Sequence, residues 1–299
     1  PDLPIGAKID LVSAYLRGVN SAEDMARANR LTDLILQSHP EDPRAFLIKG
    51  DILNKQNQKR EARTQYLKAL VREKSNYALW EQIILIDLNL NELDSVILHT
   101  SKAKLLFPNT PSFSFYNGLA NLMTKKYSDA VESLEQARRI SLDNNEMQQE
   151  IFAQLGDAYH NLKEHDKSAQ AFDEALRLDS VNAHVLNNYS YFLSLEKRQL
   201  DKALAMGQRL IRLFPEDPTY LDTYGWVLYV RKEYSAAKPV LEKAAKSSNS
   251  GVIWEHYGDV LFQLGKVNEA LDAWKKAAEL GGEISELLAK KLKDKKLYE

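Results

Sequence analysis

The sequence at 218–250, PTYLDTYGWVLYVRKEYSAAKPVLEKAAKSSNS, is followed at 251–282 by GVIWEHYGDVLFQLGKVNEALDAWKKAAELGG. When the second stretch is written beneath the first, glycine, alanine and a bulky apolar residue fall at the same positions. The matched pairs are Gly225 and Gly258, Ala237 and Ala270, and Leu241 and Trp274. Small residues let two helices approach closely, and a bulky residue fills the space beside them. Each stretch therefore predicts one pair of packed helices.

The same pattern extends over most of the chain in steps of 33 to 38 residues. The predicted repeats begin at 9, 43, 77, 111, 149, 183, 218 and 251. Position eight of these repeats carries the small residues Gly50, Gly118, Gly156, Ser190, Gly225 and Gly258. A single hairpin cannot bury its apolar stripe alone, so neighbouring hairpins must stack to form a core. The period therefore predicts an array of helical hairpins.

This arrangement of small and large residues resembles the tetratricopeptide-repeat (TPR) family over 9–282. The resemblance implies an all-α fold: a right-handed superhelical solenoid of about eight helix-turn-helix repeats, followed by a C-terminal capping helix. The predicted domains are an N-terminal lead-in at 1–8, the repeat array at 9–282 and the capping helix at 283–299.

Capping and solvation signals add detail to this prediction. Six repeats carry a capping residue where the second helix is expected to begin, namely Asp94, Ser128, Asp166, Asp201, Ser235 and Asn268. In the C-terminal segment, Leu287, Leu288 and Leu292 follow helical spacing. We expect its lysines to keep the outer face in water; these are Lys290, Lys291, Lys293, Lys295 and Lys296.

One step of the repeat is irregular. Repeats four and five are 38 residues apart, and the excess falls in the polar stretch SLDNNEMQQ at 141–149. We expect these residues to lengthen a helix or a loop. Two interpretations stay open: the insertion is a bend or hinge, or it is a tolerated surface insertion.

Composition excludes several classes of function. The net charge of −2 gives no general attraction to nucleic acid. The sequence contains no uninterrupted stretch of about 18 apolar residues, so it predicts no transmembrane segment. The chain has no Cys, which removes disulfides and thiolate sites. Because it opens at Pro1 without a Met, we expect a trimmed fragment whose targeting segment, if any, is missing.

The sequence holds no recognisable catalytic or metal-binding motif. His160, His184 and His256 lie on predicted first helices, without the spacing of a metal-binding motif and without Cys partners. We interpret them as ordinary surface or groove histidines. The sequence therefore predicts no enzyme, no catalytic residue, no cofactor and no metal ion.

In TPR proteins the first helices line a concave groove, and positions two, five, nine, twelve and thirteen of each repeat point into it. Carried over to this sequence, that resemblance implies a partner-binding groove of Leu85, Leu88, Phe115, Leu119, Leu122, Met123, Asp157, Tyr191, Asp222, Trp226, Tyr229, Glu255, Asp259 and Phe262. Large apolar residues on an exposed surface are typical of interaction sites. The alternative is that neighbouring helices bury these side chains as core.

The groove positions also differ from a known mode of TPR recognition. TPR domains that clamp the C-terminal carboxylate of cytosolic chaperones use Lys at position five and Asn at position nine of their first repeat. Here those positions hold Ser13 and Arg17. We therefore predict a protein or peptide partner with apolar anchors and some basic residues, bound without that clamp.

A second resemblance concerns origin. The stretch from Asn187 to Ala245 is similar to the C-terminal repeats of bacterial envelope TPR proteins, many of which are exported or lipid-anchored lipoproteins. It implies a periplasmic or outer-membrane-associated protein that supports assembly of an envelope complex, with a cytoplasmic location also open.

Three hypotheses about function follow from the sequence. The first is a non-catalytic scaffold whose groove binds a partner segment. The second is a structural spacer or self-assembly module, and the third is the regulatory arm of a larger protein. The sequence leaves the oligomeric state open.

Overall fold

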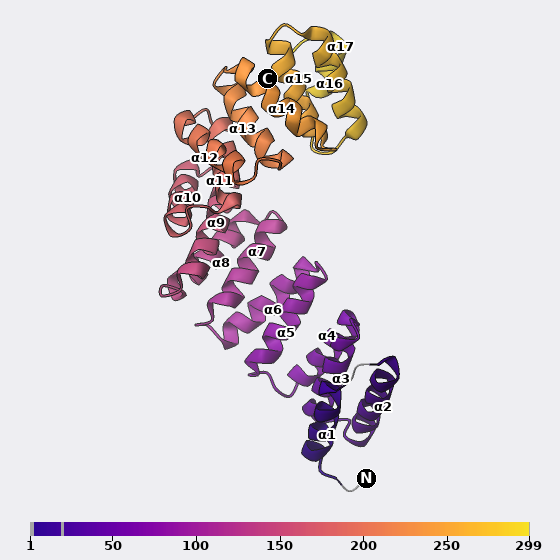
Figure 1. Ribbon diagram of the computed structural model, residues 1–299. Helices are drawn as coiled ribbons and strands as arrows, with labels where there is room; N and C mark the ends of the chain where they lie inside the picture. The colour runs from indigo at the N-terminus through magenta and orange to yellow at the C-terminus, as the bar shows by residue number, and fades with distance from the viewer. Residues whose placement is uncertain (1–2, 19–20, 299) are drawn as a thin grey trace. The chain divides into compact units, whose positions relative to one another are not determined.

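The computed structural model describes residues 3–18 and 21–298, and these ranges contain seventeen α-helices and no strand. The chain divides into two compact units, with the boundary between Asp143 and Asn144. Figure 1 shows the helices of each unit as successive hairpins along the chain. The predicted all-α repeat fold is confirmed. Among the described residues, no helix combines the length and the apolar run that crossing a membrane requires.

The first unit contains eight helices that pair into hairpins: α1 (Ile5–Arg17), α2 (Ala22–Ser38), α3 (Pro43–Lys55), α4 (Lys59–Leu70), α5 (Tyr77–Asn89), α6 (Leu93–Leu106), α7 (Pro111–Met123) and α8 (Tyr127–Ile140). Helix α1 begins before the predicted repeat start at residue 9, so part of the predicted lead-in is helical. Residues 1 and 2 of that lead-in lie outside the described residues.

The second unit contains four more hairpins and a short last helix: α9 (Asn145–Asn161), α10 (His165–Leu178), α11 (Ala183–Leu195), α12 (Leu200–Leu213), α13 (Pro218–Val230), α14 (Tyr234–Lys246), α15 (Gly251–Gln263), α16 (Val267–Leu280) and α17 (Leu288–Asp294). Helix α9 has 17 residues, whereas α11 has 13. The four extra residues of repeat five therefore lengthen its first helix at the N-terminal end.

Small residues bring the two helices of a hairpin together. At Gly118 in α7, an added Cβ would lie 2.6 Å from Cγ of Leu134 in α8. At Gly156 in α9, an added Cβ would collide with the ring of Phe172 in α10. Real side chains do not tolerate such distances, so glycine at these positions permits the bulky residue of the second helix to pack against the first.

The predicted caps of the second helices are wrong in the structure. Each of the six residues is the second residue of its helix, and none of these helices has a side-chain cap. In most repeats the preceding turn contains a residue with positive φ, such as Lys163 at 62°, which reverses the chain early. The side-chain caps lie instead on α2 and on the first helices α3, α5, α9, α11 and α13. At α11, Asn182 accepts from the amide of Val185 at 2.9 Å.

The C-terminal segment also differs from its prediction. Helix α17 covers only 288–294, and it packs on α16 through Leu288, which is 1% exposed. Lys291, which was expected in water, is 3% exposed. Its ammonium group instead faces two carboxylates of α15, described below. The helical spacing of the leucines could not reveal this contact, because it depends on which lysine faces α15.

Candidate functional site

A cavity of about 630 Å³ lies in the second unit. Its wall is formed by residues of the first helices α11, α13 and α15, of α14, and of the C-terminal segment. Tyr191, Trp226 and Asp259 occupy position nine in three successive repeats. Because α11 contacts α13 and α13 contacts α15, these equivalent positions lie next to one another along the cavity.

Stacked aromatic rings form one side of this cavity. The ring centroids of Trp226 and Tyr229 lie 4.7 Å apart at an angle of 16°. Trp226 also stacks on the ring of His256, with 4.1 Å between the ring centroids. The indole Nε1 of Trp226 is buried and has no hydrogen-bond partner in the part of the chain that the structure describes. A buried donor without a partner costs stability, so this nitrogen is a position where an acceptor on a ligand could be satisfied.

A buried charge cluster forms another part of the wall. Lys291 Nζ lies 2.9 Å from Oε1 of Glu255 and 2.8 Å from both carboxylate oxygens of Asp259. Trp274 Nε1 donates to Asp259 Oδ1 at 2.8 Å. The backbone amide of Ser285 donates to Glu255 Oε2 at 2.8 Å. The C-terminal segment thus neutralises two acidic groove positions from within the chain.

These contacts shift the two carboxyl groups in opposite directions. Burial raises the pKa of Asp259 to about 6, although Lys291 opposes this rise. Burial alone would also raise the pKa of Glu255, but hydrogen bonds from Lys291 and Ser285 outweigh it and lower the pKa.

His256 forms a second buried pair beside the aromatic wall. Its Nδ1 lies 2.9 Å from Oδ1 of Asp222. Burial alone would lower the pKa of His256, but the Asp222 carboxylate outweighs burial and raises the pKa above its ordinary value. The histidine thus connects an acidic groove position to the stacked indole of Trp226.

The structure brings six predicted groove residues together at this cavity. Tyr191, Trp226, Tyr229, Glu255 and Asp259 line it, and Asp222 reaches it through His256. Two others lie elsewhere in the second unit. Phe262 stacks on Trp274 with 5.6 Å between ring centroids. Asp157 accepts from Asn188 at 2.9 Å and lies 2.7 Å from Nε2 of His184.

The predicted groove residues of the first unit vary in exposure. Leu85 and Met123 are 43% and 53% exposed. Leu88, Phe115, Leu119 and Leu122 are half-buried. Leu88 packs against the core of the first unit, where neighbouring helices bury groove positions as the alternative interpretation expects.

Sequence reasoning missed the contribution of the C-terminal segment to the cavity. Glu283, Ser285, Leu287, Lys291 and Tyr298 line it. These residues follow the last repeat, so the 34-residue period says nothing about where they lie. The one available signal was the pair of acidic groove positions in α15, Glu255 and Asp259, which need a cation if they are buried.

Three family models match separate parts of the chain. One tetratricopeptide-repeat model matches residues 21–78, and another matches residues 149–182. The model described as anaphase-promoting complex, cyclosome, subunit 3 matches residues 196–277.

A human protein, protein O-mannosyl-transferase TMTC3, is 22% identical over 236 residues, which make up 78% of this chain and 25% of that protein. This chain therefore spans about a quarter of the length of that curated relative.

Two solved structures are similar in fold. A tetratricopeptide repeat protein from Parabacteroides merdae ATCC 43184 has a TM-score of 0.64 and 16% identity, covering 85% of this chain and 98% of that chain. YrrB, a TPR protein with an unusual peptide-binding site, has a TM-score of 0.51 and 18% identity, covering 70% of this chain and 97% of that chain. The residue period, the paired helices and the matching models agree that the chain contains tetratricopeptide repeats in both units.

Proposed function

We propose that the chain is a non-catalytic protein-interaction scaffold and that a segment of its partner binds in the cavity of the second unit. The observation that carries this proposal is the aromatic wall of Tyr191, Trp226 and Tyr229 beside a cavity of about 630 Å³. Cavities of roughly 300–1,000 Å³ with apolar walls and a few polar groups are typical of binding sites. Aromatic residues supply much of the energy at protein interfaces.

The proposed occupant is a partner segment with an apolar or aromatic anchor. Its side chain would pack against the stacked rings of Trp226 and Tyr229. An acceptor on the segment would pair with Nε1 of Trp226, which has no hydrogen-bond partner among the described residues. Because Lys291 and His256 neutralise the acidic positions, apolar contact contributes more to this recognition than charge does.

The same proposal extends to the first unit, where the exposed Leu85 and Met123 lie on predicted groove positions. YrrB is a TPR protein with a peptide-binding site, which supports peptide recognition as the mode of binding.

A selection from a displayed library of random peptides tests this proposal without a known partner. The Tyr191→Ala/Trp226→Ala variant removes two of the three side chains that form the aromatic wall. Phe214→Ala is the matched control, because Phe214 is a 42% exposed aromatic residue of the same unit that does not line the cavity. We expect peptides with an aromatic or aliphatic anchor to bind the unchanged chain and the control but not the double variant. Equal binding by the double variant, still helical by circular dichroism, would show that the cavity is not the site.

A finer part of the proposal concerns the cell envelope. The resemblance of 187–245 to bacterial envelope TPR proteins supports an assembly role there. Fractionation of the source organism tests it: the protein should be recovered with the envelope, and recovery with the cytoplasm alone contradicts it.

A second candidate function is favoured because the human relative is longer than this chain. Because that relative is about three times as long as this chain, we propose as the alternative that the array is the interaction arm of a larger protein. The mass of the native protein decides this: a mass near 34.1 kDa contradicts the larger protein.

A further inference from the structure

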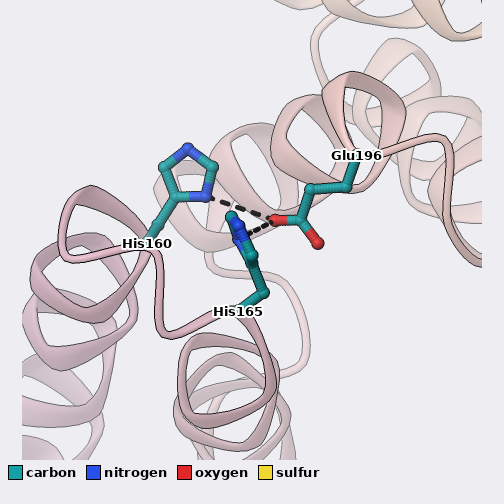
Figure 2. Close-up of side chains that lie close together, drawn as sticks. All are labelled: His160, His165 and Glu196. Carbon is teal, nitrogen blue, oxygen red and sulfur yellow. Dashed lines mark ion pairs between the residues drawn. The ribbon is translucent and has the colours of Figure 1, made fainter.

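Two histidines and one glutamate converge outside the cavity, in another part of the second unit. Figure 2 shows the side chains of His160, His165 and Glu196 directed toward one another. Oε1 of Glu196 lies 2.7 Å from Nδ1 of His165 and 3.4 Å from Nδ1 of His160. One nitrogen from each ring and one carboxylate oxygen all lie within 4.8 Å of one another.

The fold brings these residues together across two repeats. His160 is the last residue but one of α9, and His165 is the first residue of α10. The turn between them reverses at Lys163, whose φ is 62°. Glu196 follows the end of α11, the first helix of the next repeat, and α11 contacts both α9 and α10. The stacking of repeats five and six therefore creates the cluster.

Nδ1 of His160 and Nδ1 of His165 each make an ion-pair contact with Glu196, but neither has a hydrogen-bond partner among the described residues. Nδ1 of His160 and Nδ1 of His165 are both buried, and neither contact with Glu196 has hydrogen-bond geometry. Buried polar atoms in folded proteins are almost always satisfied, so an unsatisfied pair that faces the same carboxylate oxygen needs an explanation. A bound cation would satisfy both nitrogens and the oxygen at once.

Neighbouring side chains hold the ligand atoms in place. The ring of His160 stacks on Phe192 with 3.5 Å between centroids and an angle of 1°. Oε2 of Glu196 lies 3.6 Å from Nη1 of Arg198, which leaves Oε1 toward the histidines. Such outer contacts orient the ligands of metal sites in proteins.

We propose that His160, His165 and Glu196 bind a divalent transition-metal ion such as Zn²⁺. Imidazole nitrogen suits Zn²⁺, and two histidines with one carboxylate are a known ligand set that leaves a coordination position open. At Zn–ligand distances of about 2.0–2.2 Å, tetrahedral ligand atoms lie roughly 3.3 Å apart. The distance between His160 Nδ1 and Glu196 Oε1 fits this value. The distance between His165 Nδ1 and Glu196 Oε1 is shorter, and a small rotation of the His165 side chain, which is 36% exposed, lengthens it.

The proposed ion would connect the α9–α10 turn of repeat five with the end of α11 in repeat six. It would therefore stabilise the stacking of these repeats, and its open position would accept water or a ligand atom from a partner. Sequence spacing does not reveal this site, because Glu196 comes from a different repeat and the His160–His165 spacing matches no metal-binding motif.

The test uses the full chain without a histidine tag, freed of metal with a chelator and then dialysed. Zn²⁺ binding is measured by titration calorimetry, and Co²⁺ is added as a spectroscopic probe of coordination. We expect one ion per chain and a visible Co²⁺ absorption band typical of tetrahedral nitrogen and oxygen ligands. His165→Ala and Glu196→Gln should each weaken binding by more than about tenfold, the lower end of what even an outer-shell change costs.

His184→Ala is the matched control, because His184 belongs to the same unit but pairs with Asp157 outside the cluster. It should bind Zn²⁺ as the unchanged chain does. The proposal is overturned if the unchanged chain binds no ion, or if His165→Ala and Glu196→Gln bind as tightly as the control. His165 is half-exposed, so this variant should fold even if His160→Ala does not, and circular dichroism verifies that it has.

Discussion

His256 connects the aromatic wall of the cavity to a buried acid. Its ring stacks on Trp226, and its Nδ1 faces Asp222 at 2.9 Å. The raised pKa of His256 means that the folded chain holds this proton more tightly than the unfolded chain does. The stability from this pair is fully present below the ordinary value of 6.5, and it is lost as pH rises through the folded-state pKa.

The pKa of His256 can be measured directly by NMR titration. We expect it to lie above 6.5 in the unchanged chain and to fall in Asp222→Asn, because burial then acts without the opposing carboxylate. His184, which pairs with Asp157, is the internal reference and should keep its pKa in the same variant. A pKa of His256 that does not change with Asp222→Asn contradicts this account.

Helix pairing depends on single small residues, which is why the repeat pattern in the sequence predicted the hairpins correctly. The glycine in α9 and the phenylalanine in α10 leave no room for a side chain at position 156. The caps of the second helices were predicted wrongly because a lysine in the sequence does not predict a positive φ at that position. At Lys163 the backbone has a positive φ, and α10 therefore begins earlier than the sequence predicts.

Gly156→Leu should force α9 and α10 apart, with a loss of about 1–3 kcal/mol or more in the free energy of unfolding. Gly6→Ala is the control, because an added Cβ there meets only Arg44 Nη1 at 3.9 Å. Gly6 is the second residue of α1, so this exchange should change the free energy of unfolding by less than about 1 kcal/mol. Urea unfolding followed by circular dichroism measures both, and an unchanged midpoint for Gly156→Leu would mean that the helices do not meet there.

The last helix is held to α15 by one buried lysine. Lys291→Met would leave the carboxylates of Glu255 and Asp259 without their cation. Removing one member of a buried ion pair costs about 3–5 kcal/mol, so we expect early unfolding of the second unit. Lys293→Met is the control, because Lys293 is exposed on the same helix. If both variants unfold at the same urea concentration, the buried pair does not hold the cap.

For the whole molecule, the repeat period predicted the residues that occupy equivalent positions in successive repeats. It could not predict residues outside the repeats or contacts between different repeats. Tyr191, Trp226 and Tyr229 occupy repeat positions that the sequence assigned to the groove, and all three line the cavity. The groups that complete the wall, such as Ser285 and Lys291, lie beyond the last repeat. The cluster of His160, His165 and Glu196 depends on contacts between repeats, which a single-repeat pattern cannot describe.

The most direct test of the central claim is affinity capture from lysate and membrane fractions of the source organism, with proteins identified by mass spectrometry. The unchanged chain, Phe214→Ala and Tyr191→Ala/Trp226→Ala are compared side by side, each shown to be folded. The account predicts a partner that the first two capture and the double variant loses. If the double variant captures the same proteins in the same amounts, the cavity does not bind the partner.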